Sequence, residues 1–278
     1  YGSLNNYYVN AKEVAESQYP WIARVIHSRS SYVPHICTAV CIADAIFITA
    51  SRCIYTLKVN YTRILHNTKF YNALAFVVPS VPTPQAFDDI GFVVVHSKNS
   101  RNSWRTIKPF NAVNRTDGAF RWFSKVETSY GKNDYKVVGY AMLKGIDKIR
   151  APERQYHLTE LNVIVSLDLC HRTLAENLKL KVYRLPCYHS CTYKQFLNGD
   201  SRCKNYHGVE GGAIINTRSN QLLGIATWGY HHAKFEFPVG FSVVNSRNFY
   251  NDLRCARRIR DDNGLRIVKG YYQKLCDK

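Results

Sequence analysis

Short segments rich in Val, Ile, Tyr and Phe recur along most of the chain, and they constrain the fold more than any other feature of the sequence. Turn-forming residues separate them, which is the pattern of β-strands joined by short loops. The predicted strands cover 22–27, 37–48, 61–65, 69–78, 90–95, 135–143, 162–166, 212–216, 221–228 and 239–244. Many short strands with turns between them indicate an all-β sandwich or barrel.

Two segments carry a helical pattern. Residues 167–178 predict a short helix, and 246–260 predict a longer one with Ser246 as its N-cap. The apolar stripe of the longer helix consists of Phe249, Leu253, Ala256 and Ile259. The opposite face carries Arg254, Arg257, Arg258 and Arg260. This arginine face is a candidate anion-binding site, although a charged helix face is most often simply solvated.

The bulk composition fits a globular protein with an excess of positive charge. Of the 278 residues 46% are hydrophobic, which is enough for a sizeable core. We find no apolar run of about twenty residues that would predict a membrane-spanning helix. No charged-then-apolar leader begins at Tyr1, so a leader was removed or never present. The net charge of +18 predicts attraction to anionic partners, or only a generally basic surface.

The cysteines and two sequons favour a secreted protein. Nine cysteines are many for a chain of this size and suggest an oxidising compartment. Their odd number leaves at least one thiol free or shared with another chain. Asn60-Tyr61-Thr62 and Asn114-Arg115-Thr116 are glycosylation sequons, each a weak signal by itself.

Eight short stretches follow one another in a fixed order: "YPW" (19–21), "HIC" (35–37), "ITASRC" (48–53), "FDDIGFVVV" (87–95), "GYA" (139–141), "GVEGGAI" (208–214), "GIATWG" (224–229) and "PVGFSVV" (238–244). With the basic helix after them, they resemble the chymotrypsin-like serine protease family, particularly its insect members, from about residue 8 to 262. The resemblance implies an all-β fold of two antiparallel six-stranded β-barrels with a C-terminal α-helix.

The resemblance also implies boundaries along the chain. We expect an N-terminal extension at 1–7, a first barrel at 8–120, a second barrel at 121–245, a helix at 246–262 and a tail at 263–278. The polar stretch 109–134 falls where the family crosses between its barrels, and we interpret it as a bridge.

The family's catalytic residues map onto a changed set. Hydrolysis of this type needs a nucleophilic hydroxyl, an imidazole base and a carboxylate that orients the base. By resemblance, Arg52 stands at the histidine position and Glu210 at the serine position, and only Asp89 is retained. An arginine cannot lose its proton at a useful pH, so it cannot act as a general base. The chain is therefore expected to lack protease activity, and Arg52 to form an ion pair with Glu210, Asp89 or both.

The family's activation device and specificity pocket are changed as well. Tyr8 stands at the position of the freed N-terminus, and Val209 stands at the buried aspartate that pairs with it. Both partners of the ion pair that forms the oxyanion hole are therefore expected to be missing. Val239 stands at a glycine that keeps the pocket open, so we expect the pocket to be filled.

The disulfides can be assigned only in part. The resemblance implies a bridge between Cys37 and Cys53, and it implies that Cys170 pairs with Cys187 or Cys191. The pairing of Cys41, Cys191, Cys203, Cys255 and Cys276 stays open. An interchain disulfide through Cys276 is one hypothesis for the odd cysteine.

Three roles are compatible with an inactive protease homologue. The first is a secreted binding, cofactor or scaffold protein, since the fold presents loops on a rigid base. The second is a structural subunit of a larger assembly, including an intracellular one, held by protein partners or by homo- or hetero-oligomerisation. The third is a binder of an anionic glycan, lipid surface or nucleic acid.

Two further chemistries are less well supported. A hydrolase with a relocated nucleophile would have to use residues such as Cys203 or His207, which lack a recognisable base-and-orienter set. "CYHSC" (187–191) with His207, His231 and His232 could bind zinc, but the spacing does not match a structural zinc site. We therefore expect no metal and no cofactor.

Overall fold

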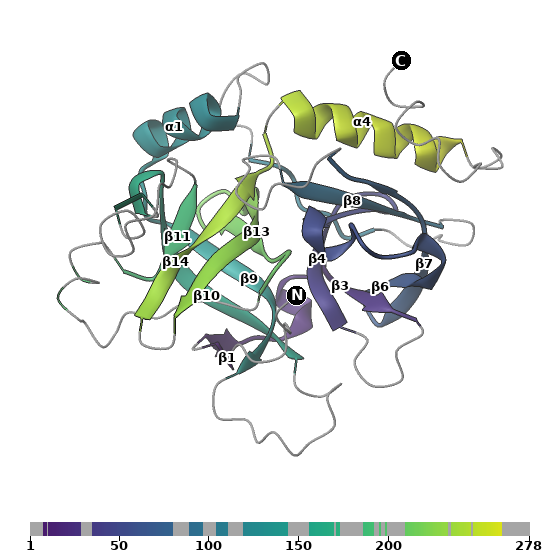
Figure 1. Ribbon diagram of the computed structural model, residues 1–278, viewed down its shortest axis with the longest axis horizontal. Helices are drawn as coiled ribbons and strands as arrows, with labels where there is room; N and C mark the ends of the chain where they lie inside the picture. Colours follow the sequence, from purple (N-terminus) through teal and green to yellow (C-terminus); the bar gives the residue numbers. More distant parts are fainter. Residues whose placement is uncertain are drawn as a thin grey trace.

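The computed structural model contains two β-barrels, and helices α1 (Ala119–Tyr130) and α4 (Arg247–Asp261) lie over them in Figure 1. It describes residues 8–9, 11–28, 35–79, 89–96, 104–110, 119–143, 156–169, 171–172, 186–191, 195, 198, 209–232, 235–245 and 247–262. Within these ranges, no helix is both long enough and apolar enough to cross a membrane.

The first barrel closes from six strands in the order β3-β4-β5-β8-β7-β6, all paired antiparallel. They are β3 (Ile22–His27), β4 (His35–Ala43), β5 (Ile46–Ala50), β6 (Thr62–His66), β7 (Lys69–Val77) and β8 (Ile90–Val95). Every residue of β5 and β8 is buried, because the barrel interior lies on one face and a helix covers the other. This explains why these strands read as continuous apolar runs and do not alternate with polar residues.

The second barrel is a ring of six strands in the order β9-β12-β13-β14-β11-β10, closed by the pairing of β10 with β9. They are β9 (Tyr135–Leu143), β10 (Tyr156–Ser166), β11 (Cys187–His189), β12 (Ala213–Asn216), β13 (Gln221–His232) and β14 (Phe235–Val243). With the C-terminal helix, this confirms the predicted fold of two closed antiparallel six-stranded barrels.

The N-terminal strands belong to the sheet of the second barrel. β1 (Tyr8–Val9) pairs parallel with β9, and β2 (Lys12–Glu13) pairs antiparallel with β10. The expected first-barrel range of 8–120 therefore begins with strands that hydrogen-bond to the other barrel. Three short 3-10 helices, η2 (Glu16–Gln18), η3 (Ser51–Cys53) and η4 (Val59–Tyr61), connect strands in the N-terminal half.

One predicted strand is two strands in the structure. Residues 37–48 were expected to form a single strand, but the chain turns at Asp44 and Ala45 to give the β4–β5 hairpin. Ala45 has φ of 58°, a conformation more typical of glycine or asparagine, so the turn carries little signal in the sequence.

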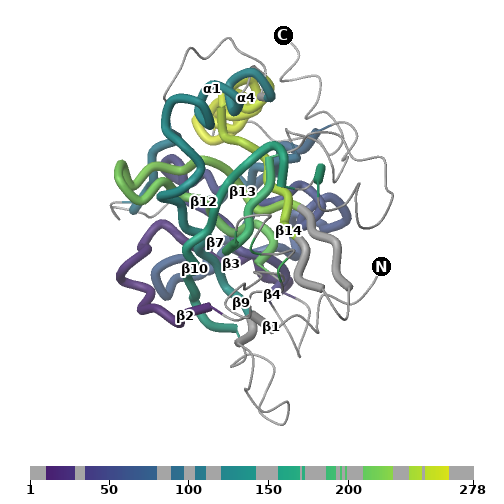
Figure 2. The backbone as a smooth tube through the Cα atoms, turned by 90° about the vertical axis from the view of Figure 1, so that its left-hand side faces the viewer, coloured from purple at the N-terminus to yellow at the C-terminus, as the bar shows by residue number. Residues whose placement is uncertain are grey.

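Helix α1 (Ala119–Tyr130) lies within the stretch interpreted as a polar bridge. It buries Trp122, Phe123 and Val126 against the second barrel's core. Figures 1 and 2 show α1 on the same side of the molecule as helix α4 (Arg247–Asp261).

Helix α4 packs on β8, β7 and β5 of the first barrel. The predicted stripe of Phe249, Leu253, Ala256 and Ile259 is buried, as expected. Its proposed N-cap, Ser246, lies outside the described residues. Of the shorter helix predicted at 167–178, residues 168–169 and 171–172 are helical, and 170 and 173–178 are not described.

Truncating the buried side of α4 should cost far more stability than truncating its exposed side. Leu253→Ala removes a side chain that packs in the first core, so we expect the free energy of unfolding to fall by about 2–5 kcal/mol. Arg254→Ala, one residue along on the exposed face, should change it by less than about 0.5 kcal/mol. Urea denaturation of both variants checks this, and similar losses would contradict the packing of α4.

Candidate functional site

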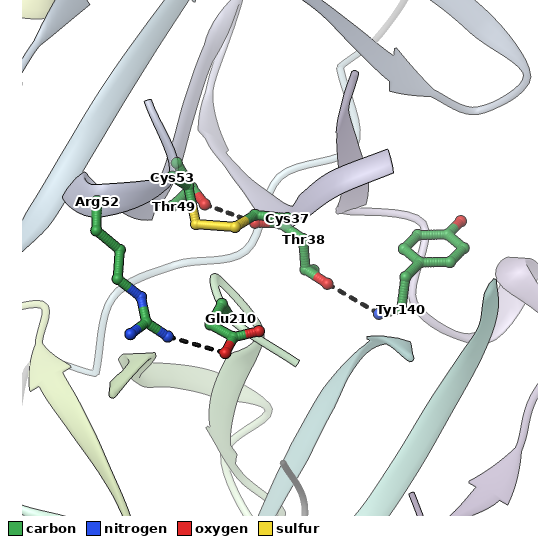
Figure 3. Close-up of a disulfide and its surroundings, with 7 residues drawn as sticks. All are labelled: Cys37, Thr38, Thr49, Arg52, Cys53, Tyr140 and Glu210. Carbon is green, nitrogen blue, oxygen red and sulfur yellow. Dashed lines mark hydrogen bonds and ion pairs between the residues drawn. A yellow bond between two sulfur atoms is a disulfide. The ribbon is translucent and has the colours of Figure 1, made fainter. Parts of the chain in front are cut away.

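Arg52 lies in the 3-10 turn that directly follows a strand of the first barrel, and the residue after it forms a disulfide. β5 ends at Ala50, and the chain enters η3, whose last residue, Cys53, is bonded to Cys37 of β4. This is the disulfide expected by resemblance, and the two Cα atoms lie 6.1 Å apart. Both neighbours of Arg52 are buried, which fixes its backbone, and its side chain extends toward Glu210 (Figure 3).

Thr38 of β4 fixes the position of Glu210. The amide of Thr38 donates a hydrogen bond to the Glu210 carbonyl at 2.9 Å, and the Thr38 carbonyl accepts one from the Thr49 hydroxyl at 2.7 Å. The Thr38 hydroxyl in turn accepts the Tyr140 amide of β9 at 2.9 Å. One residue of the first barrel thus binds two segments of the second, as Figure 3 shows for Tyr140.

The approach of the Glu210 loop to β4 depends on Gly211. Gly211 has φ of +79°, and a Cβ atom built there would lie 1.9 Å from the Thr38 carbonyl oxygen. A side chain at this position is therefore excluded both by backbone conformation and by space.

Arg52 and Glu210 form an ion pair across the junction of the two barrels. Arg52 Nη2 lies 2.9 Å from Glu210 Oε1, and the two side chains are 36% and 17% exposed. Figure 3 shows the guanidinium and the carboxylate pointing toward one another. The prediction that Arg52 would pair with a carboxylate is confirmed for Glu210.

Asp89 is buried near this pair, but its hydrogen-bond donor is Ser51 and not Arg52. Only 1% of the residue is exposed, and the hydroxyl of Ser51 donates a hydrogen bond to its Oδ1. The Asp89 amide donates to the Ser242 hydroxyl at 3.0 Å. Asp89 Oδ2 is buried and has no hydrogen-bond partner among the described residues.

This environment raises the pKa of the Asp89 carboxyl. Burial is the largest cause, and it is opposed by the Ser51 hydrogen bond and by the positive charge of Arg52. Arg52 therefore acts on Asp89 through its field, while its direct ion pair is with Glu210. The role of Ser51 was not anticipated, because a contact between residues 51 and 89 leaves no local pattern in the sequence.

Val209 lies in the second core. It is buried, and its Cγ2 lies within 2.7 Å of where a Cβ atom would stand at Gly139 or at Gly212. Val209 thus fills a space closed on two sides by glycine backbone. The backbone of Tyr8 lies in β1 opposite Met142.

Val239 of β14 is buried in the same core. Its register partners are Tyr188 of β11 on one side and Gly229 of β13 on the other. A branched side chain therefore stands opposite the glycine of the "TWG" stretch.

Three histidines are buried among the described residues, namely His35, His66 and His189, and each has a hydrogen-bond partner outside the Arg52–Glu210 pair. His35 accepts a hydrogen bond from Arg24 Nε at Nδ1, and burial together with Arg24 lowers its pKa well below its ordinary value. His66 Nε2 lies 2.8 Å from the Pro20 carbonyl oxygen, and its ring stacks on Trp104. Burial lowers the pKa of His66 as well.

The cysteine expectations are partly resolved. Cys41 is a free, buried thiol, and burial raises its pKa. Cys187, Cys191 and Cys255 are disulfide-bonded. Cys187 and Cys191 therefore cannot supply the thiolates of the zinc site considered from the sequence. Cys170, Cys203 and Cys276 lie outside the described residues.

The remaining candidate residues lie on the surface or outside the described ranges. Asn60 is exposed in η4, and the hydroxyl of its sequon partner Thr62 donates to the Lys58 carbonyl at 2.9 Å. Asn114 is not described. On α4, Arg254, Arg257 and Arg258 are exposed, whereas Arg260 Nε pairs with Asp261 at 2.7 Å.

Comparison with known proteins agrees with this architecture. Residues 8–250 match the trypsin family, so the chain belongs to that family. The chain is similar in fold to the VesB protease of Vibrio cholerae, with a TM-score of 0.56 and 14% identity over 89% of this chain and 67% of that one. It is also similar to HL collagenase, with a TM-score of 0.58 and 15% identity over 93% of this chain and 100% of that one. No curated protein matches the sequence.

Removing Arg52 alone should be more damaging than removing the whole ion pair. Arg52→Ala leaves the Glu210 carboxylate mostly buried without its counter-ion, whereas Arg52→Ala with Glu210→Ala leaves no charge to solvate. Because Arg52 is partly exposed, we expect a coupling energy of about 1 kcal/mol. Urea denaturation of the four proteins at neutral pH measures it, and strictly additive losses would show that the pair is not coupled.

The contribution of Asp89 to stability should depend on pH with a defined sign. Since burial raises its pKa above the ordinary value of 3.8, the native state holds the proton more tightly than the unfolded state. This contribution is complete below 3.8 and is lost as pH rises through the folded-state pKa. Asp89→Asn stays neutral, so its stability relative to the unaltered protein should increase across that window. Denaturation of both proteins between about pH 3 and about pH 7 tests this, and a constant difference would refute it.

Proposed function

We propose that this chain is a non-catalytic member of the trypsin family that acts as a secreted binding, cofactor or scaffold protein. The Arg52–Glu210 ion pair is the observation that supports this proposal most directly. By resemblance, these two residues stand where the family has its proton acceptor and its attacking alcohol.

The chemistry of the pair accounts for the proposed inactivity. A guanidinium remains protonated at physiological pH and can only donate hydrogen bonds. An ionised carboxylate only accepts them, and Glu210 already binds Arg52. Arg52 therefore cannot take a proton from water or from an alcohol, and Glu210 places a carboxylate bound to Arg52 where, by resemblance, the family has the hydroxyl that attacks the substrate. Asp89, at the position that orients the base, has Ser51 as its hydrogen-bond donor instead of an imidazole.

The surroundings of Val209 and Val239 support the same proposal. An apolar side chain at position 209 cannot pair with an N-terminal ammonium, so the family's route to an ordered oxyanion hole is absent by resemblance. The buried branched side chain of Val239 opposite Gly229 leaves less room for a substrate side chain than glycine would.

The disulfides and the exposed asparagine of a glycosylation sequon among the described residues support secretion. The Cys37–Cys53 bridge and the bonded Cys187, Cys191 and Cys255 are typical of an oxidising compartment. Asn60 is exposed, as a glycan acceptor must be. Cys41, in contrast, is a buried thiol, so the odd cysteine count no longer requires a bond to another chain.

The purified protein should not hydrolyse peptides or esters and should not react with a fluorophosphonate probe. An active trypsin-family protease, treated in parallel, provides the positive control for both reagents. Trace contamination is recognised by comparison with Glu210→Ala, because contaminating activity would be equal in both preparations. Labelling or turnover that disappears in Glu210→Ala would overturn the proposal.

A further inference from the structure

Helices α1 and α4 lie along the same side of the molecule, although more than 100 residues separate them in the chain. Figure 1 shows α1 over the second barrel and α4 over the first, nearly end to end, and Figure 2 shows both at the same edge. The two helices therefore form one elongated surface, which we call the α1–α4 face.

Cationic side chains are exposed on both helices of the α1–α4 face. They are Arg121 and Lys125 on α1, and Arg254, Arg257 and Arg258 on α4. The apolar sides of both helices pack on the barrels, so these five side chains are on the parts of the helices that remain accessible. From the sequence, only the arginines of α4 form a candidate anion-binding site. The cations of α1 could not be added, because α1 and α4 are far apart in the chain and only the fold brings them to the same side.

The cations of the two helices outnumber their carboxylates. Glu127 of α1 turns toward the second barrel, where it pairs with Lys132 at 3.0 Å and accepts the Ser166 hydroxyl at 2.7 Å. Asp261 at the end of α4 pairs with Arg260. Asp252 is the remaining acidic residue in these helices. The α1–α4 face therefore retains a net positive charge.

The cations on each helix are spaced so that like charges are neighbours. Arg121 and Lys125 are four residues apart, and Arg254 lies three and four residues before Arg257 and Arg258. Like charges at these spacings are neighbours on a helix surface and destabilise it by a few tenths of a kcal/mol per pair. A bound polyanion would relieve this repulsion.

We propose that the α1–α4 face binds a linear sulfated polysaccharide. Arginine forks bind tetrahedral oxyanions through two parallel hydrogen bonds, and four of the five cations are arginines. Helices of 12 and 15 residues span about 18 and 22 Å, so the face can contact several anionic groups of one extended chain.

The choice of a glycan over nucleic acid rests on the secretion proposed above, because an extracellular protein meets sulfated glycans more often than nucleic acid. A lipid surface is disfavoured by the same proposed location, because anionic lipids are concentrated in the cytoplasmic leaflet of membranes. Among the described side chains of α4, the exposed ones are arginine, asparagine and aspartate, with no large apolar side chain to insert, whereas α1 exposes Phe120 and Tyr130. The inference supplies a partner class for the proposed binding role, but it does not require the Arg52–Glu210 site to be inactive.

The test measures binding of the whole protein to heparin, the probe for a sulfated polysaccharide, as a function of salt. One variant combines Arg121→Gln, Arg254→Gln and Arg257→Gln, and so removes one cation from α1 and two from α4. The matched control combines Lys58→Gln, Arg63→Gln and Lys69→Gln, three exposed cations outside the two helices. Thermal melts verify that both variants fold, and the single variants Arg254→Gln and Arg63→Gln replace them if either triple does not.

We expect the α1–α4 variant to elute from heparin at lower salt and the control to elute close to the unaltered protein. The slope of log Kd against log salt should fall by about 2 for three lost contacts. A second variant, Arg121→Gln with Lys125→Gln, should also weaken binding.

Three results would overturn the proposal. Equal losses in the two triple variants would mean that binding follows net charge alone. An unchanged affinity after Arg121→Gln with Lys125→Gln would remove α1 from the site. Tighter binding to duplex DNA or to anionic phospholipid vesicles than to heparin at equal salt would show that the partner class is wrong.

Discussion

The ion pair between Arg52 and Glu210 is the interaction on which this account depends, and each half of the molecule supplies one of its charges. A disulfide and a 3-10 turn fix Arg52, while a backbone hydrogen bond to Thr38 and the left-handed conformation of Gly211 fix Glu210. The side chains therefore meet because the backbone around them is rigid. A pair with a partly exposed arginine adds little stability by itself, so its importance lies in what it prevents. The pair places a permanently protonated guanidinium and a carboxylate where, by resemblance, the family has an imidazole base and a nucleophilic hydroxyl.

The carboxyl group of Asp89, next to this pair, is held in a different environment. Asp89 remains buried, and the Ser51 hydroxyl provides one hydrogen bond while its second oxygen has no partner among the described residues. Such a group is more easily kept neutral than charged, which agrees with its raised pKa. The positive charge of Arg52 acts in the opposite direction. The three positions thus form one electrostatic unit, in which a change at Arg52 affects both carboxyl groups.

Much of the fold could be predicted from the sequence where strands are short, apolar and bounded by turn residues. The bounds expected for 22–27, 90–95 and 135–143 are those of β3, β8 and β9. The turn at Asp44-Ala45 was missed because it interrupts a buried run without glycine or proline. Helix α1 was missed because its core residues, Trp122, Phe123 and Val126, stand among polar residues and only their helical spacing marks them. The Arg52–Glu210 pair could be predicted from opposite charges at aligned positions, whereas the Ser51–Asp89 contact and the neighbourhood of α1 and α4 depend on long-range packing.

A membership in the trypsin family thus defines the scaffold, and the side chains at its barrel junction decide what the scaffold can do. The most direct measurement of the central claim is a mass-spectrometric search for cleavage products after incubation of the purified protein with a peptide mixture that contains every residue type. The account predicts that no peptide bond is cleaved, whatever its flanking residues. Cleavage products that are present with the unaltered protein and absent with Arg52→Ala would contradict it.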